Sequence, residues 1–330
     1  MHPRRPIVWK AMTARSKTNG THDAFVVISP CRNEAAYART TLDSVLAQSR
    51  PPDLWVIVDD GSTDGTSDIL ADYARREARL SIVTRGDRGR RAVGPGVIEA
   101  FYAGLETVDL SRFSYLCKLD LDLDLPPQYF AELLGRMQDN PRLGSCSGQP
   151  YFRNASGQSI SEKLGPELSV GMSKFYSRAC FEDIGGFVRA VMWDAIDCHR
   201  ARLRGWTPRS FGDDAVAFEH LRPMGSSEKG VLTGRNRHGR GQYFMGSDPL
   251  YFAATAVYRM AHPPYVTGGF AMLSGYAGEW LTGAERYPDL ELRAFIRAYQ
   301  RRALLMGKRR AIAEIEARTP LPAALAGEDV

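Results

Sequence analysis

The chain contains no long apolar run. One uncharged stretch, residues 263–278, is interrupted by Pro264 and by glycines, and it is shorter than the roughly 20 apolar residues that a membrane-spanning helix needs. Residues 1–22 are polar and basic and hold no segment typical of a cleaved signal peptide. The sequence therefore predicts a cytoplasmic protein without a membrane-spanning helix, with residues 1–22 as a flexible tail.

Cysteine and net charge are also scarce. The five cysteines are an odd number without the paired short spacings of zinc sites or disulfide frameworks, which is typical of buried thiols in a reducing compartment. They are Cys31, Cys117, Cys146, Cys180 and Cys198. The net charge of +5 is too small to predict a nucleic-acid partner. At 330 residues, the chain can bury a core without a disulfide or metal staple.

Two alternating patterns organise the first third of the chain. Short β-rich apolar runs occur at residues 24–29, 54–59 and 80–84, and segments with helical periodicity occur at residues 34–48, 67–79 and 97–105. Runs that are apolar at every position are typical of parallel strands buried on both faces. The alternation predicts a doubly wound α/β sheet, whose ligands bind beyond the carboxyl ends of the strands.

The turns after the first two strands carry polar side chains instead of a glycine-rich phosphate loop. Residues 29–34 replace the Gly-x-Gly-x-x-Gly pattern, which argues against a dinucleotide-binding dehydrogenase. Asp59 and Asp60 end the second strand, where a carboxylate can accept a hydrogen bond from a nucleotide base or a ribose. The alternative is a turn that caps the next helix, a role that suits Asp64 or Ser67 better than Asp59.

Three aspartates alternate with leucines at residues 120–124. If the strand continued, Asp120, Asp122 and Asp124 would share one face, at a spacing that lets two of them reach one ion. Oxygen ligands suit Mg²⁺ or Mn²⁺, which take their remaining ligands from phosphates and water. The alternative is a solvated edge strand protected by its charges.

A further aspartate, Asp194, begins a predicted helix that runs to Arg204 and stops at Gly205. It can serve as a helix cap or as a general base that takes a proton from an acceptor hydroxyl.

Together these motifs resemble family 2 glycosyltransferases of the GT-A type. The resemblance covers about residues 24–225 and is carried by residues 30–34, residues 58–66, the Asp-x-Asp element at 120–122, and residues 185–187 followed by Asp194. It implies a GT-A doubly wound mixed sheet and inverting transfer from a nucleotide-diphosphate sugar, with a divalent cation on the Asp-x-Asp motif.

The resemblance also implies roles for individual residues. Pro30, Arg32 and Glu34 belong to the donor-binding set, and Asp59 or Asp60 contacts the base. Asp120 and Asp122 contact the ribose, the diphosphate and the metal. Asp194 is the base. Trp193 stands where the family usually has Glu, so Asp197 is the reserve candidate for the base.

The remaining candidate residues come later in the chain. His220 follows a short strand-like run and either lines the metal site or is a buried, hydrogen-bonded histidine. Arg237 and Arg240, with Arg235 and His238, predict a basic loop over the diphosphate, and the alternative is a solvated linker.

The last segment is basic and amphipathic. Residues 293–310 hold seven lysines or arginines and no acid, which is typical of a helix on an anionic membrane surface or of a helix packed on the catalytic domain. Five aromatic residues upstream suit either a membrane interface or a core, namely Tyr251, Phe252, Tyr258, Tyr265 and Phe270.

We therefore expect a catalytic GT-A domain at residues 23–225 and a basic loop with a helical region at residues 226–330. The expected reaction moves a sugar to a glycan or polyprenyl-linked acceptor in cell-surface polysaccharide synthesis, in the cytoplasm or at the inner face of the plasma membrane. A sugar nucleotidyltransferase is the nearest alternative enzyme, but residues 30–34 are not its glycine-rich loop. A catalytically inactive nucleotide- or glycan-binding module is the other alternative, and the retained aspartates argue against it.

Overall fold

The computed structural model describes residues 23–87, 94–162, 164–222 and 230–326. The predicted tail at residues 1–22 and the first part of the predicted basic loop, residues 226–229, therefore lie outside the described residues.

The strands are β1 (Phe25–Cys31), β2 (Leu54–Asp59), β3 (Leu80–Thr84), β4 (Tyr115–Leu119), β5 (Leu123–Asp124), β6 (Ser145–Gly148), β7 (Pro150–Arg153), β8 (Ser159–Ser161), β9 (Ser173–Ser177), β10 (Pro208–Phe211) and β11 (Phe218–His220). The helices are α1 (Ala38–Leu46), α2 (Thr66–Arg76), α3 (Pro95–Leu105), α4 (Tyr129–Asp139), α5 (Arg178–Asp183), α6 (Trp193–Leu203), α7 (Val231–Met245), α8 (Pro249–Met260), α9 (Val266–Leu281), α10 (Leu290–Met306) and α11 (Lys308–Arg318).

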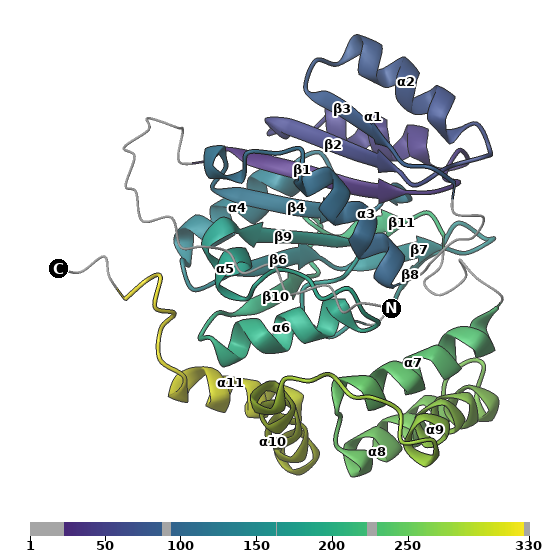
Figure 1. Ribbon diagram of the computed structural model, residues 1–330, viewed down its shortest axis with the longest axis vertical. Helices are drawn as coiled ribbons and strands as arrows, with labels where there is room; N and C mark the ends of the chain where they lie inside the picture. Colours follow the sequence, from purple (N-terminus) through teal and green to yellow (C-terminus); the bar gives the residue numbers. More distant parts are fainter. Residues whose placement is uncertain (1–22, 88–93, 163, 223–229, 327–330) are drawn as a thin grey trace.

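A mixed seven-stranded sheet forms the centre of the molecule (Figure 1), in the order β10-β6-β9-β4-β1-β2-β3. Strands β4, β1, β2 and β3 are parallel to one another, and β9 runs antiparallel to both of its neighbours. A smaller sheet, β5-β11-β7-β8, lies beside it. The predicted parallel strands are confirmed, and the sheet is mixed, as the family resemblance implies.

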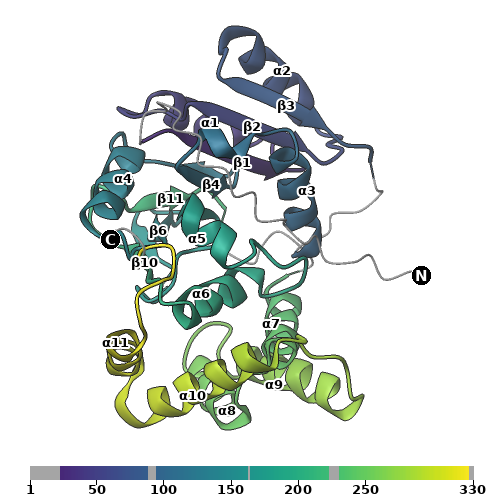
Figure 2. The ribbon, with the colours of Figure 1, turned by 60° about the vertical axis from the view of Figure 1, so that its left-hand side comes forward.

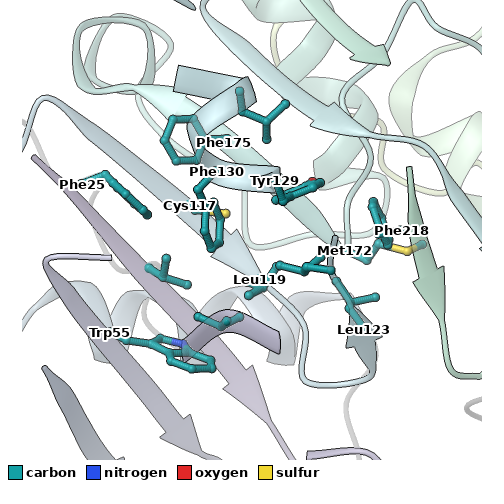
Figure 3. Close-up of a cluster of buried hydrophobic side chains, with 14 of the residues drawn as sticks. Phe25, Trp55, Cys117, Leu119, Leu123, Tyr129, Phe130, Met172, Phe175 and Phe218 are labelled. Carbon is teal, nitrogen blue, oxygen red and sulfur yellow. The ribbon is translucent and has the colours of Figure 1, made fainter. Parts of the chain in front are cut away.

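Helices cover both faces of the large sheet, which explains why residues 25–28 of β1 and residues 54–58 of β2 are apolar at every position. Phe25 and Val27 face one cluster, with side chains from α1, α2 and α4. Val26 and Ile28 face the other cluster, with side chains from α3, α5 and α6. Figure 3 shows the first cluster, in which Phe25, Phe130 and Phe175 pack together. Each such side chain contributes about 1.5–3 kcal/mol when it leaves water, so this core fixes the strand ends that carry the polar turns.

Helices α7 to α11 gather below the sheet, and the turned view in Figure 2 shows the same separation. The prediction of a basic loop is wrong for the described part, because residues 231–245 form helix α7. Helix α7 packs very closely on α9. A Cβ at Gly239 or Gly275 would collide with the backbone carbonyl of the facing helix, so both positions accept only a hydrogen atom.

Helix α10 packs on the catalytic domain. Leu292 and Ile296 form a cluster with Ile196 of α6 and Met245 of α7. Part of its charge is neutralised within the molecule, since Arg301 pairs with Asp248 at 2.8 Å. Leu292 and Ile296 are thus packed as the second alternative for this segment expects, while Leu304 and Leu305 near the end of α10 are exposed.

Among the described residues, no helix has both the length and the apolar character needed to cross a membrane. All five cysteines are buried and unpaired.

Candidate active site

A cavity of about 640 Å³ lies at the carboxyl ends of β1, β2 and β4. Its wall on the sheet side comes from the turns after these strands and from the start of α6, and its other wall comes from α7, α8 and α10. The predicted residues that line it are Pro30, Arg32, Glu34, Asp60, Asp120, Asp122, Asp194, His220 and Arg237. Asp59, Asp197 and Arg240 are not part of this lining.

The turn after β1 is fixed against the turn after β2. Arg32 donates to the backbone carbonyl of Asp60 at 2.6 Å and pairs with Asp87 at the same distance. The backbone N–H of Asn33, a residue in the left-handed region at φ 56°, donates to the Ser62 hydroxyl oxygen at 2.9 Å. A non-glycine residue in this region stores strain and is common at binding sites. These contacts hold Arg32 and Asp60 at the cavity wall.

The two aspartates that end β2 have different surroundings. Asp59 is fully buried, and its carboxylate accepts from the Ser62 N–H at 2.9 Å and from the Ser67 hydroxyl at 2.5 Å. Asp59 therefore stabilises the turn, whereas Asp64 accepts from the Thr66 N–H at 3.1 Å at the start of α2, whose N-cap position is Gly65. Asp60 is buried at the cavity wall, 3.0 Å from the Arg85 guanidinium.

Strand β4 ends before the aspartate series. The Asp120 N–H donates to the Met172 carbonyl at 2.8 Å, and β5 begins only at Leu123. The expectation that Asp120, Asp122 and Asp124 share one strand face is therefore wrong for Asp124. This residue lies in β5 of the small sheet, opposite Glu219 of the antiparallel strand β11. Asp120 and Asp122 remain together at the cavity, and the buried Lys118 donates to the Asp120 carboxylate and to the Gly171 carbonyl.

Asp122 lies at the centre of a charge network. One carboxylate oxygen, Oδ2, is 2.6 Å from Arg222 and 3.6 Å from His220 Nε2. Arg222 also donates to Glu34 at 3.0 Å, and His220 Nδ1 lies 3.2 Å from Glu162. Burial alone would lower the pKa of His220, but Asp122 and Glu162 outweigh it and raise the pKa to about 9. Burial opposes ionisation of Asp122, yet His220 and Arg222 keep its pKa below the usual value.

The donor set near Asp122 fits a hard divalent cation in one respect. The other carboxylate oxygen, Oδ1, is buried and has no hydrogen-bond partner. Such an orphaned oxygen is costly unless a ligand satisfies it. In the described part of the chain, no three acidic, histidine or cysteine side chains are already arranged around one ion position. A cation here would therefore take most of its ligands from a phosphate and water.

Asp194 lies in the first turn of α6 and borders the cavity. Met192, just before the helix, has a left-handed backbone at φ 61°. Opposite, Gly171 leaves room for the carboxylate, since a Cβ there would be 2.9 Å from Asp194 Oδ2. Trp193 points inward to the core, where Lys118 and Lys174 lie 5.2 and 5.7 Å from its ring. The aromatic residue thus adjoins two cations, an arrangement that stabilises both.

Asp197 lies below this site, fully buried. Lys174 Nζ is 2.7 and 2.6 Å from its two carboxylate oxygens, and the Tyr176 hydroxyl also donates to it. Lys174 is itself completely buried and donates to the Asp194 carbonyl at 2.7 Å. Asp197 therefore neutralises a buried lysine that holds the backbone of Asp194.

The predicted basic residues on α7 divide between the cavity and the surface. Arg235, Arg237, His238 and Gln242 line the cavity. Arg240 points away and pairs with Glu279 on α9. Burial and the charges of Arg235 and Arg259 lower the pKa of His238 to about 4, against the effect of Asp194.

Sequence reasoning missed Lys118, Lys174 and Arg222 as parts of the site. A lysine within an apolar strand was the available signal for Lys118, because an ammonium group at such a position must find a carboxylate. Lys174 gave a weaker signal, because serines stand at both ends of its strand. Nothing local indicated that Arg222 would join Asp122 to Glu34.

Comparison with known proteins agrees with this fold. The model of the family described as glycosyl transferase family 2 matches residues 26–204. EpsH of Bacillus subtilis (strain 168) is 27% identical over 181 residues, which are 52% of this chain and 48% of that protein. A poly-β-1,6-N-acetyl-D-glucosamine synthase of Staphylococcus epidermidis is 28% identical over 127 residues, which are 38% of this chain and 28% of that protein. The chain thus matches about half, or less, of the length of these relatives.

Among solved structures, GalNAc-T7 with UDP, GalNAc and Mn²⁺ has a similar fold. The TM-score is 0.52 at 14% sequence identity, and the superposition covers 80% of this chain and 55% of that chain.

Proposed function

The chain belongs to glycosyl transferase family 2, and we propose that it transfers a sugar from a nucleotide-diphosphate sugar to an acceptor hydroxyl with inversion at the anomeric carbon. One observation carries this proposal. A single cavity gathers Asp60, Asp122 and Asp194 from three separate elements, in a sheet whose ligands bind at this end.

The sheet side of the cavity is the proposed donor site. Asp60 accepts hydrogen bonds from the nucleotide, and Pro30, Arg32 and Glu34 form the wall beside it. Arg237, on the opposite wall, pairs with the diphosphate. Asp59 shapes the turn through Ser62 and Ser67 instead of touching the donor.

We assign the proposed cation, Mg²⁺ or Mn²⁺, to Asp120 and Asp122. His220, the third predicted ligand, does not fit this role, because its raised pKa of about 9 keeps the ring protonated near neutral pH and both ring nitrogens face carboxylates. The orphaned Oδ1 of Asp122 supports this assignment, because carboxylate oxygen is the ligand that these cations prefer. The similar solved structure, GalNAc-T7, was determined with Mn²⁺ and UDP. When bound, the cation supplies positive charge that offsets the charge of the diphosphate.

Asp194 is the proposed base. The acceptor hydroxyl gives its proton to the Asp194 carboxylate while its oxygen forms a bond to the anomeric carbon. The bond from that carbon to the phosphate oxygen breaks, and its electron pair leaves with the nucleotide diphosphate. Lys174 positions the backbone of Asp194, and Asp197 is not the base because Lys174 and Tyr176 occupy its oxygens.

The acceptor is proposed to be a glycan or a lipid-linked sugar. The similarity to a poly-β-1,6-N-acetyl-D-glucosamine synthase supports a role in cell-surface polysaccharide synthesis. We propose that the enzyme acts in the cytoplasm, at or near the inner face of the membrane.

Calorimetric titration of UDP and GDP, with and without Mn²⁺, tests the donor site. We expect Mn²⁺ to tighten binding of one nucleotide to the parent protein and Asp122→Asn to remove this gain. Asp124→Asn is the matched control, because it loses the same charge in β5 outside the cavity. Equal affinity of the Asp122→Asn and parent proteins in Mn²⁺ would refute the metal assignment.

Release of nucleotide from donor sugars tests the reaction. Asp194→Asn is expected to bind nucleotide normally and to lose roughly 10²–10⁴-fold in transfer rate. A parent protein that binds nucleotide but neither transfers nor hydrolyses any sugar donor is a binding module. Formation of a nucleotide sugar from a nucleoside triphosphate and a sugar phosphate identifies a nucleotidyltransferase.

A further inference from the structure

Helices α7, α8 and α9 expose a set of large apolar side chains at one of their ends. The start of α9 packs on the end of α8 and on the start of α7, since a Cβ at Gly269 would lie 2.6 Å from the Ala256 carbonyl and one at Gly268 4.0 Å from Arg235 Cγ. We name the exposed residues there the helix-end surface: Val231, Val257, Tyr258, Tyr265, Val266 and Phe270. Tyr258 is 62% and Phe270 61% exposed. Apolar patches of this kind mark sites of interaction.

Two arginines stand between this surface and the cavity. Arg235 follows Val231 by one turn of α7, Arg259 directly follows Tyr258 on α8, and both line the cavity. In the parts of the chain that the structure describes, neither forms an ion pair with an acidic side chain. Burial and the charge of Arg259 lower the pKa of Arg235. Two neighbouring guanidinium groups repel each other unless an anion lies with them, and their planar N–H forks match phosphate oxygens.

The same two arginines lie near the proposed base. His238 lies one helical turn beyond Arg235. The charges of Arg235 and Arg259 lower the pKa of His238, and the charge of Asp194 opposes them. All four groups line the cavity, and α7 meets the start of α6 there, since a Cβ at Gly241 would lie 2.6 Å from Met192 Cγ. From the helix-end surface inward, the order is apolar side chains, two cations and then a carboxylate.

We propose that the acceptor is a lipid-linked sugar phosphate, with its hydrocarbon chain on the helix-end surface and its phosphate between Arg235 and Arg259. This inference rests on the proposed function, and it specifies the acceptor class of that site. The order of groups in such an amphiphile, hydrocarbon then phosphate then sugar hydroxyl, matches the order of groups in the protein. The charge of the arginine pair distinguishes this acceptor from a neutral glycan. It also places the lipid contact on α7, α8 and α9, at residues other than 293–310.

Calorimetry on the full chain with three soluble probes tests the proposal. The probes are farnesyl phosphate below its critical micelle concentration, farnesol and inorganic phosphate. We expect farnesyl phosphate to bind at least about tenfold more tightly than either of the others, because it uses both parts of the site. Arg259→Gln is expected to weaken farnesyl phosphate binding about tenfold and to leave farnesol unchanged. The double variant Tyr258→Ser, Phe270→Ser is expected to weaken both isoprenoids and to leave phosphate unchanged.

Matched controls come from α10 and α11. Arg309→Gln removes an exposed arginine and Leu305→Ser removes a leucine that is 85% exposed, both outside the cavity, and neither is expected to alter any probe. Arg259→Lys keeps the charge but loses the planar fork, so it is expected to bind farnesyl phosphate with intermediate affinity, which covers the case that Arg259→Gln does not fold.

Two results would overturn the inference. If farnesyl phosphate binds no better than inorganic phosphate, the site binds only a free anion. If Arg259→Gln binds farnesyl phosphate as tightly as the parent protein does, the arginines do not hold the phosphate. Nucleotide binding in Mn²⁺, measured on the same samples, separates the two proposals. A protein that binds farnesyl phosphate but no nucleotide contradicts the proposed transferase and leaves the lipid-phosphate site in place. The reverse pattern contradicts the lipid-phosphate site alone.

Discussion

The substitution Asp197→Asn separates a structural carboxylate from a catalytic one. In the parent protein, Asp197 is 1% exposed and compensates the charge of Lys174, which is 0% exposed. Asparagine has nearly the same shape but no charge, so it leaves an ammonium group buried without a counterion. Loss of one partner from a buried pair costs about 3–5 kcal/mol. Since each kcal/mol shifts the melting temperature of a domain of this size by about 2–4 °C, we expect a fall of roughly 10 °C.

Asp194→Asn is the matched control, because it makes the same chemical change three residues earlier on the same helix. Asp194 borders the cavity and is not the partner of a buried lysine. Its carboxylate interacts favourably with the start of α6, so its loss costs only about 0.3–1 kcal/mol. Thermal and urea unfolding of both variants, followed by circular dichroism, measures the difference.

The double variant Asp197→Asn, Lys174→Met removes the stranded charge together with its partner. We expect it to recover part of the stability that Asp197→Asn loses, because the two residues are in direct contact. If Asp197→Asn melted within about 2 °C of the parent, or the double variant recovered nothing, the electrostatic account of this pair would be refuted.

Three further outcomes are expected. Gly239→Ala is expected to destabilise by about 1–3 kcal/mol in urea unfolding despite the better helix propensity of alanine, because its methyl group meets the Met272 carbonyl; an unchanged midpoint would contradict the close packing of α7 and α9. Burial lowers the pKa of His199 to about 3, so this histidine stays neutral in the folded state while the unfolded chain gains a proton below pH 6.5. The contribution of His199 to the free energy of unfolding is therefore complete above pH 6.5 and declines as the pH falls toward 3, by about 2 kcal/mol at pH 5. Urea midpoints at pH 7.5 and pH 5 measure this decline, and His199→Gln is expected to remove the share that His199 contributes to it. Asp59→Asn is expected to lower the melting temperature, and Asp60→Asn is expected to weaken nucleotide binding. If Asp59→Asn weakened nucleotide binding and Asp60→Asn lowered the melting temperature instead, the two roles would be reversed.

The strands of the donor half could be predicted because both of their faces are covered. Residues 25–28 contact one helix layer or the other at every position, and this leaves a continuous apolar run in the sequence. The turns after the strands could be located for the same reason, and with them Asp60 and Asp122, whereas Asp194 was located as the start of a predicted helix. In these segments, local sequence and global fold agree.

Helix α7 could not be predicted from its own residues. Three glycines within it, Gly234, Gly239 and Gly241, lower helix propensity and favour a loop. In the structure, Gly239 permits the close approach of α9, so tertiary packing overrides the local preference. The role of Asp197 was likewise hidden, because its partner Lys174 is supplied by a different strand of the sheet.

The bridge that Arg222 makes from Glu34 to Asp122 has a consequence for the order of folding. Its hydrogen bond to Glu34 joins residues 188 positions apart in the chain, and its bond to Asp122 joins residues 100 positions apart. Closing loops of this length costs entropy before any native contact repays it, so such contacts form late. During synthesis, the turns that hold Glu34 and Asp122 emerge long before Arg222. Until β11 docks, those carboxylates lack their guanidinium partner, and the donor pocket is therefore among the last parts of the molecule to assemble.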